Sequence, residues 1–294
     1  MSVLKGKVAI VTGSSRGIGK AIAIELAQKG VSIVLNGRDS SRLEEATNEL
    51  KQIHENVISI CCDVSIAEQS KDMISQAIEN FGKLDILINN VGVSMRGNVA
   101  DLNPEVYKTV FESNVLGQVN PTIPALKELR KTQGSLVFIS SLAGIRGLPY
   151  LSAYSSSKMA LRAIAESIRI EEKQNNIHVG LILVGITQIE HNKETISADG
   201  AKIILKNRDS SKVDSTKTVA EKGGRTLLLN RKTNRSNKSY DSLKEHYPKA
   251  NFVDIECDLQ SLKSVKKAAK KITNLCKDGL DVLCNNAGVM ALKD

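Results

Sequence analysis

The sequence predicts an α/β fold, a doubly wound parallel sheet with a partial repeat of the same fold at the C-terminus. Short apolar runs rich in β-branched residues alternate with longer amphipathic runs, and a glycine-rich turn follows the first apolar run. This alternation is typical of a parallel sheet, because right-handed crossovers place helices on both of its faces. We expect one such domain over residues 1–215 and a partial second copy over residues 216–294.

The expected strands are the apolar runs, each bounded by a glycine, a charge or a polar turn. In chain order they are KVAIVTG (7–13), VSIVLN (31–36), VISICCDV (57–64), LDILINNVG (84–92), SLVFISS (135–141) and HVGLILVG (178–185). The expected helices carry apolar residues three and four positions apart, which gathers them on one face. In chain order they are GKAIAIELAQKG (19–30), RLEEATNELKQIH (42–54), EQSKDMISQAIENFG (68–82) and YSSSKMALRAIAESIRIEE (154–172).

The C-terminal part echoes the N-terminal part. LAQKGVSIVLNGRDSSR at 26–42 matches VAEKGGRTLLLNRKTNR at 219–235, and LDILINNVGV at 84–93 matches LDVLCNNAGV at 280–289. The offset grows only from 193 to 196, so the two stretches are collinear, which indicates an internal repeat. The second stretch has no counterpart of the glycine-rich turn. We therefore expect it to contribute neither a phosphate loop nor catalytic residues.

Composition excludes several classes of protein. The chain has 294 residues, 41% of them hydrophobic, and a net charge of +9 that falls mostly after residue 216. Aromatic residues are only 3% and no nucleic-acid reader motif is present, so a solvated basic surface is favoured over a nucleic-acid interface. The five cysteines lack metal-ligand spacing, and no run approaches the roughly 20 apolar residues of a membrane helix. We expect a soluble cytoplasmic protein without a signal peptide, a transmembrane segment or a metal site.

The glycine-rich turn is a candidate phosphate cradle. Its glycines stand between a strand and a helix, where backbone N–H groups can approach a pyrophosphate and the helix N-terminus favours negative charge. The spacing is G-x-x-x-G-x-G, and its context favours a Rossmann dinucleotide site over a merely tight turn. The candidate residues are Gly13, Ser15, Arg16, Gly17, Ile18 and Gly19.

The end of the second expected strand bears on the choice of dinucleotide. An acidic residue there binds the ribose 2′-hydroxyl in NAD sites, but this chain has Gly37, followed by Arg38. Together with Arg16, Arg38 offers guanidinium groups that suit a 2′-phosphate. Asp39 is interpreted as the turn or cap residue of the next helix. NADP(H) is therefore preferred, and NAD(H) remains possible.

A tyrosine and a lysine lie four positions apart in SAYSSSK at residues 152–158. On a helix, Tyr154 and Lys158 share one face. A neighbouring positive charge favours the phenolate, so we expect the ammonium to lower the pKa of the tyrosine and to tune it for proton transfer.

With TGSSRGIG, NNVG, FISS and YSSSK in this order, residues 5–190 resemble the short-chain dehydrogenase/reductase family. The resemblance implies an NAD(P)-dependent oxidoreductase acting on a small-molecule carbonyl or alcohol. It makes Tyr154 the general acid/base, Lys158 its partner and the ligand of the nicotinamide ribose, and Ser141 the residue that orients the substrate oxygen. It further places Asn114 in a water-mediated proton relay. For the adenosine side of the cofactor it implies Asn90, Gly92 and Asp63.

The chain departs from the family pattern after GLILVG. Val184 stands where the family has proline, and Ile189 stands where a threonine contacts the nicotinamide amide, which leaves Thr187 as the nearby hydroxyl. The family also ends with a final strand. RTLLLN at 225–230 fits either that strand or the second strand of the repeat. The repeat itself resembles the retinol-dehydrogenase-like branch, which suggests a fusion of two reductase fragments.

Three interpretations follow from the sequence. The first is an NADP(H)-dependent carbonyl reductase. The second is a catalytically impaired protein that binds the cofactor or acts as a scaffold, and the third is a hybrid that does not fold as one unit. The resemblance also implies a homodimer rather than a tetramer, because the family's tetramer contact uses the final strand.

Overall fold

A computed structural model describes residues 4–185 and 194–205, two strands at 225–230 and 251–256, and the single positions 245, 267, 270 and 271. The chain divides into two compact units, Met1–Asn207 and Arg208–Asp294. Thr187 and most of the expected second copy lie outside the described residues. Each unit is therefore described by itself.

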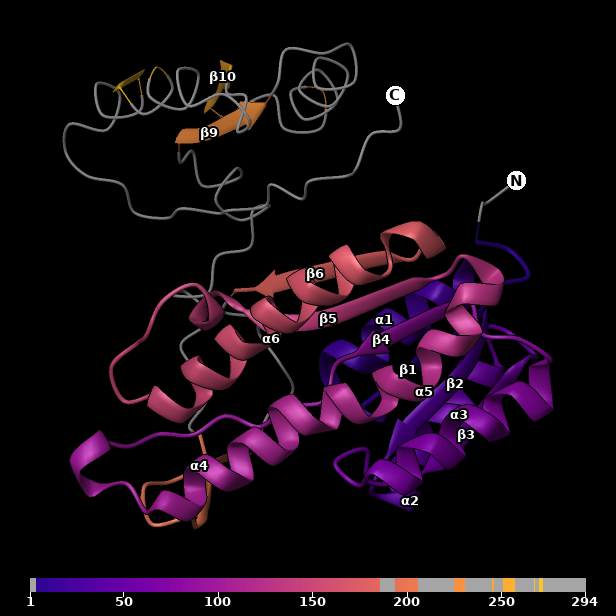
Figure 1. The fold of residues 1–294 in the computed structure, drawn as a ribbon, viewed down its shortest axis with the longest axis horizontal. Helices are drawn as coiled ribbons and strands as arrows, with labels where there is room; N and C mark the ends of the chain where they lie inside the picture. Colours follow the sequence, from indigo (N-terminus) through magenta and orange to yellow (C-terminus); the bar gives the residue numbers. More distant parts are fainter. Residues whose placement is uncertain are drawn as a thin grey trace. The chain divides into compact units, whose positions relative to one another are not determined.

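The first unit contains one six-stranded sheet in the order β3-β2-β1-β4-β5-β6 (Figure 1). All neighbouring pairs are parallel, which confirms the doubly wound fold predicted from the sequence. The strands are β1 (Val8–Val11), β2 (Ser32–Gly37), β3 (Val57–Cys61), β4 (Ile86–Asn89), β5 (Ser135–Ser141) and β6 (His178–Val184). The strand order reverses direction between β1 and β4, and ligands of open α/β sheets bind at such a switch point.

Helices cover both faces of this sheet. They are α1 (Gly17–Gln28), α2 (Ser40–Lys51), α3 (Ala67–Phe81), α5 (Gly117–Thr132) and α6 (Ser152–Glu171). A further helix, α4 (Pro104–Phe111), packs against α6. A π-helical turn, η2 (Glu112–Leu116), joins α4 to α5. Neither α4 nor α5 is among the elements expected from the sequence. Pro121 and Pro124 lie inside α5, where proline ordinarily interrupts a helical pattern.

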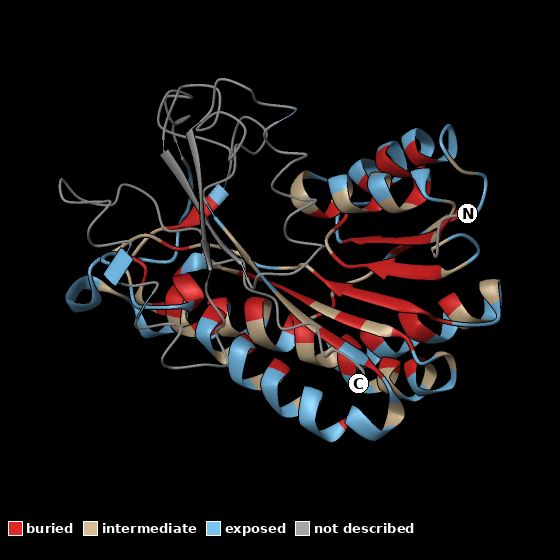
Figure 2. Cartoon of the chain, turned by 90° about the horizontal axis from the view of Figure 1, so that it is seen from above, coloured by how far each residue is buried: buried red, intermediate tan, exposed pale blue. Residues whose placement is uncertain are grey.

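The core lies in two layers, one on each face of the sheet. One layer joins strand residues such as Ile10 and Phe138 to Met73 of α3, Leu129 of α5 and Leu161 of α6. The opposite layer joins the alternate strand positions to α1 and α2; it includes Ala9, Val11, Ile33, Leu35, Ala23, Ala27, Leu43 and Leu50. The central strands β1, β2 and β4 are buried along nearly their whole length, the edge strands β3 and β6 are buried less, and the helices are buried only on the sides that face the sheet (Figure 2). This pattern explains why the central strands are mostly apolar and the helices are apolar only periodically.

A short antiparallel hairpin completes the described part of the first unit. It consists of β7 (Glu194–Ile196) and β8 (Lys202–Ile204). Ile196 pairs with Met95, which follows β4, and Ser94 and Thr195 share a hydrogen bond of 2.8 Å between their hydroxyls. The hairpin therefore fixes the segment that leads away from the carboxyl end of β4.

In the second unit, β9 (Arg225–Asn230) pairs in parallel with β10 (Asn251–Glu256). RTLLLN thus forms a separate two-stranded sheet with β10, as expected if it is the second strand of the repeat. The repeat aligns β9 with β2 residue for residue, and β2 pairs in parallel with β3 in the first unit. The pairing supports the proposed internal repeat, which stays a prediction.

Asp85 links the amino ends of β1 and β4. Its carboxylate accepts a hydrogen bond from the Val8 backbone N–H at 2.9 Å and forms ion pairs with Lys7 at 3.2 Å and Lys83 at 3.1 Å. Burial favours the neutral acid, but the hydrogen bonds from Val8, Lys83 and Lys7 outweigh it, so the pKa of Asp85 is lowered. The charged form is therefore the one that stabilises the fold.

We predict that Asp85→Asn lowers the free energy of unfolding by about 1–3 kcal/mol near neutral pH. Because the folded pKa is depressed, the contribution is present above the unfolded pKa of about 3.9 and is lost as pH falls through the folded value. Urea denaturation at several pH values should therefore show that the difference in free energy of unfolding between wild type and variant shrinks below about pH 4. The control Glu68→Gln removes an exposed ion pair and should cost less than about 1 kcal/mol. A gap independent of pH would contradict the assignment.

Candidate active site

The glycine-rich turn between β1 and α1 has a backbone that side chains would block. Gly13 and Gly17 have φ of +61° and +58°, the left-handed region that favours glycine. A Cβ on Gly19 would lie 2.5 Å from the Gly13 carbonyl oxygen and 2.5 Å from Asn90 Nδ2. Arg16, the N-cap of α1, is exposed and makes no side-chain cap. The turn therefore lets α1 pack closely against it, and the side chain of Arg16 does not cap the N-terminus of α1. A phosphate cradle requires both features.

Asn90 holds this turn from the end of β4. Its side-chain amide donates to the carbonyl oxygens of Thr12 at 3.0 Å and Gly13 at 3.1 Å, and its backbone N–H donates to Thr12 Oγ1 at 2.9 Å. The resemblance placed Asn90 at the adenosine ribose, which stays a prediction. Its visible role is to fix the shape of the cradle.

Asn36 of β2 was not singled out from the sequence. It is 1% exposed, its Oδ1 accepts from the Gly13 N–H at 3.3 Å, and its Nδ2 donates to the carbonyl oxygens of Ile60 and Cys62, both at 3.2 Å. One amide thus ties the cradle to β3. The sequence feature that could have indicated this role is the position of Asn36, a polar residue within the otherwise apolar run SIVLNG.

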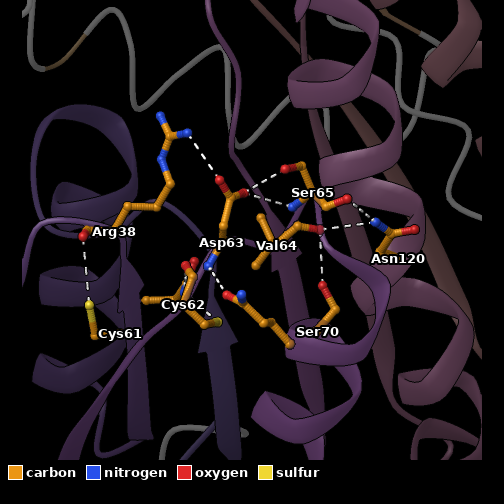
Figure 3. Close-up of polar contacts among 10 residues, drawn as sticks. Arg38, Cys61, Cys62, Asp63, Val64, Ser65, Ser70 and Asn120 are labelled. Carbon is orange, nitrogen blue, oxygen red and sulfur yellow. Dashed lines mark hydrogen bonds and ion pairs between the residues drawn. The ribbon is translucent and has the colours of Figure 1, made fainter.

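The carboxyl end of β2 carries the expected basic residue. Arg38 is exposed, and its guanidinium donates to Asp63 Oδ2 at 3.1 Å (Figure 3). A Cβ on Gly37 would lie 3.2 Å from Ser15 Oγ, so an acidic side chain there would press on the cradle. Asp39 accepts a hydrogen bond from the Arg42 N–H and caps α2, which confirms its interpretation as a cap.

Tyr154 and Lys158 share one face of α6, with Lys158 Nζ 6.0 Å from the centroid of the tyrosine ring. Lys158 is 4% exposed, and its ammonium donates to the Ile139 carbonyl oxygen at 3.0 Å. A Cβ on Gly92 would lie 3.1 Å from Lys158 Nζ and 3.1 Å from Asn114 Oδ1. The segment after β4 therefore approaches the lysine closely, and only a glycine leaves that approach open.

The pKa of Tyr154 is raised from its ordinary value. Burial is the main cause, and a hydrogen bond with Ser141 and the charge of Arg96 only partly offset it. Desolvation of the phenolate sets the net direction of this shift. The expectation that Lys158 lowers the pKa of Tyr154 stays a prediction. At neutral pH the phenol holds its proton.

Ser141 and Ser140 end β5 and have different roles. The Ser141 hydroxyl accepts from the Ala143 N–H at 3.2 Å and shares the hydrogen bond with Tyr154, so it lies beside the phenol as expected. Ser140 is buried and donates to the Lys158 carbonyl oxygen at 3.1 Å. Ser140 is therefore a hydrogen-bonded serine at the end of the strand.

Asn114 lies in the π-helical turn η2, a distortion that often marks functional sites. Its side chain is completely buried; Oδ1 accepts from the Val93 N–H at 2.6 Å, and Nδ2 donates to the Val93 carbonyl at 2.9 Å and to Ser157 Oγ at 2.9 Å. The amide thus joins the segment after β4 to α6. A relay through Asn114 stays a prediction, as does the approach of Asp63 to an adenine.

Arg96 was not expected as a site residue, and no motif marks it. Tyr150, whose residue four positions on is Tyr154 and not a lysine, was expected only in the substrate wall or in packing. The Arg96 N–H donates to the Ile196 carbonyl at 2.8 Å, and the Gly97 N–H donates to the Tyr150 carbonyl at 3.1 Å. Tyr150 is 60% exposed and has a φ of +63°, a strained value for a tyrosine. Long-range packing of the β7–β8 hairpin thus shapes the wall around Tyr154.

The doubly wound sheet, the glycine cradle at its switch point and the tyrosine–lysine pair beside it define a Rossmann-type nucleotide-binding protein. The family model for short chain dehydrogenases matches residues 7–200 and 213–294. The chain belongs to the short-chain dehydrogenase family.

Individual relatives support this assignment. The chain is 39% identical over 184 residues to the 3-ketodihydrosphingosine reductase of Bos taurus, which covers 60% of this chain and 55% of that reductase. The structure of L-sorbose reductase from Gluconobacter frateurii, complexed with NADPH and L-sorbose, matches with a TM-score of 0.62 and 30% identity over 64% of this chain and 73% of that one. A short-chain dehydrogenase/reductase from Burkholderia phymatum in complex with NAD matches with a TM-score of 0.62 and 26% identity over 64% and 69% of the two chains.

None of the helices in the described residues is long and apolar enough to cross a membrane. The chain spans only 55% of the length of the Bos taurus reductase, so family membership alone does not fix its activity.

We predict that Gly19→Ala raises the Kd for NADPH about tenfold or more, because the added Cβ would lie 2.5 Å from the Gly13 carbonyl and the cradle must shift. Fluorescence titration of NADPH measures the change. Gly147→Ala is the matched control, since a Cβ there meets nothing within 4 Å. Equal affinities for the Gly19 variant and wild type would show that the cradle does not hold the dinucleotide.

Proposed function

We propose that the protein is an NADP(H)-dependent oxidoreductase that reduces a small-molecule carbonyl to an alcohol, or catalyses the reverse reaction, with Tyr154 as general acid/base. The observation that carries the proposal is a partly buried, protonated phenol that is hydrogen-bonded to Ser141, with Lys158 on the same face of α6. These residues lie at the carboxyl ends of the strands, as in other open α/β sheets with ligand sites. The reductase names of the relatives support the same class of reaction.

The residues present fit a nicotinamide dinucleotide. A Cβ on Gly19 would lie 2.5 Å from the Gly13 carbonyl oxygen, and one on Gly92 would lie 3.1 Å from Lys158 Nζ, so glycine at these positions keeps the cradle in the shape that a pyrophosphate requires and keeps the backbone close to the lysine. When bound, the cofactor supplies or accepts a hydride. Arg38 and Arg16 favour the 2′-phosphate, and Gly37 takes the place of the acid that would bind a 2′-hydroxyl. NAD(H) remains the alternative, since relatives bound to NAD and to NADPH both match. Thr187, the candidate nicotinamide contact, lies outside the described residues.

The chain's own side chains supply the proton chemistry. Because burial keeps Tyr154 protonated, its phenol can give a proton to a carbonyl oxygen as that oxygen gains negative charge. Ser141 orients the same oxygen by hydrogen bonding. Lys158, fixed by the Ile139 carbonyl, places a positive charge beside the phenolate that proton transfer leaves behind. Asn114 holds the segment after β4 against α6 and so keeps these groups together.

We expect Tyr154→Phe to lower turnover by at least about a hundredfold, the usual contribution of a general acid, while the Kd for NADPH stays within about twofold. Consumption of reduced nicotinamide over a panel of steroid, acyl-thioester, sugar and quinone carbonyls is the measurement. Tyr107→Phe, a tyrosine of α4 in the same apolar cluster, is the control and should keep its activity. Unchanged turnover in Tyr154→Phe would refute the mechanism. Wild type that binds NADPH but reduces no carbonyl would favour the scaffolding alternative.

The proposal extends to a homodimer formed through α5 and α6. Both helices expose apolar side chains, Ile123 at 66% and Met159 at 44%, and burial of such groups drives association. We predict that wild type sediments as a dimer at micromolar concentration and that Ile123→Asp shifts it toward monomer. The control is Ile53→Asp, which changes an exposed apolar residue that follows α2 and lies outside both helices. Monomeric wild type would overturn this part of the proposal.

A further inference from the structure

At the carboxyl ends of β2 and β3, the guanidinium of Arg38 is already held by a carboxylate. Arg38 NH1 donates to Asp63 Oδ2 at 3.1 Å, and the two side chains are 68% and 30% exposed (Figure 3). Arg38 directly follows β2, where the proposed function places the 2′-phosphate of NADP(H). The ion pair therefore engages the group that would receive that phosphate.

Asp63 is the fixed member of this pair. Its Oδ1 accepts from the Ser65 N–H at 2.9 Å and from Ser65 Oγ at 2.7 Å, and its backbone N–H donates to Gln69 Oε1 at 2.8 Å. The next carbonyls of the loop are held as well, since Ser70 Oγ donates to Val64 O at 2.9 Å and Asn120 Nδ2 donates to Ser65 O at 2.7 Å. Side chains from α3 and α5 thus pin the loop that carries the carboxylate, as Figure 3 shows.

Arg38 is the member that can exchange partners. Its guanidinium stands on a long, exposed side chain, and an exposed ion pair of this kind is weak. A phosphate offers the same planar, bidentate recognition with a higher negative charge. The Asp63 carboxylate and the 2′-phosphate therefore compete for the guanidinium of Arg38, and the carboxylate is always present because it belongs to the protein.

The carboxylate is charged whenever a nucleotide would bind at neutral pH. Partial burial raises the pKa of Asp63, but the hydrogen bonds from Ser65 and Arg38 outweigh burial and lower it. Once Arg38 turns to a phosphate, Asp63 is left with the Ser65 hydrogen bonds alone and with a second anion nearby. A cofactor without the 2′-phosphate imposes neither cost.

We propose that Asp63 is a specificity determinant of the cofactor site, which restrains Arg38 and so weakens the preference for a 2′-phosphorylated dinucleotide. The proposal rests on the proposed function, because it requires that Arg38 receive the 2′-phosphate. Selectivity then depends on a repulsive element as well as an attractive one. The protein binds both classes of dinucleotide with a smaller difference in affinity than Arg38 alone would give.

The test uses the full chain and two nucleotides that differ only in the 2′-phosphate, adenosine 2′,5′-bisphosphate and adenosine 5′-monophosphate. Their Kd values are measured by isothermal titration calorimetry, so the readout does not depend on turnover. We expect Asp63→Asn to bind the bisphosphate about three- to fivefold more tightly than wild type, the range set by an exposed ion pair. Affinity for the monophosphate should stay within about twofold, because the amide oxygen of asparagine remains an acceptor both for Ser65 and for the amino group of an adenine.

Two variants distinguish restraint of Arg38 from a general charge effect. Asp39→Asn removes the same charge one residue from Arg38, where the carboxylate pairs with Arg42 instead, and should leave both affinities unchanged. In an Arg38→Gln background, Asp63→Asn should lose its gain, since no guanidinium is left to release. Thermal melts establish that each variant is folded, and Asp63→Ser replaces Asp63→Asn if the latter does not fold.

The proposal is overturned if Asp63→Asn leaves the bisphosphate affinity unchanged or tightens both nucleotides equally. It is also overturned if the gain persists in the Arg38→Gln background, because direct repulsion then replaces restraint. Failure of wild type to bind either nucleotide would overturn the proposed function together with this inference. Binding of both nucleotides without the predicted gain would overturn this inference alone.

Discussion

The close approach of three backbone segments at the switch point of the sheet is the constraint on which the rest of the site depends. α1 packs so near the turn after β1 that a Cβ on Gly19 would lie 2.5 Å from the Gly13 carbonyl. Asn90, from the end of β4, bonds to that same carbonyl and to Thr12. The turn is thereby fixed between β1 and β4, and the next residues after β4 pass beside Lys158. The phosphate cradle and the proton-transfer groups are therefore held by the same backbone segments around β1 and β4.

The electrostatics of the site follow from burial more than from charge pairs. Tyr154 holds its proton because the phenolate would be desolvated, although Arg96 and Ser141 favour it. Lys158 is directed to the Ile139 carbonyl, so its charge is fixed in place before any proton moves. At the other end of the site, hydrogen bonds reverse the effect of burial and keep Asp63 charged. The pKa values of Tyr154 and Asp63 are thus shifted in opposite directions by their surroundings.

The second unit shows what the central strand contributes. β9 and β10 pair in parallel, as β2 and β3 do, but the sequence of the repeat has no counterpart of β1 or of the glycine turn. In the first unit β1 lies between β2 and β4 and carries the cradle at its end. β9 and β10 therefore match the β2–β3 pair without the strand that carries the cradle, and the internal repeat stays a prediction.

The sequence by itself determined the doubly wound fold, the glycine cradle and the tyrosine–lysine face, because strand and helix periodicity, left-handed turns and an i,i+4 spacing are local properties of the chain. Tertiary structure decided the rest. Asn36, the buried partners of Asn114, the Arg38–Asp63 pair and the hairpin contact to Arg96 join residues 21 or more positions apart. The direction of the Tyr154 pKa was likewise decided by packing, since burial depends on neighbours that spacing within one helix does not specify.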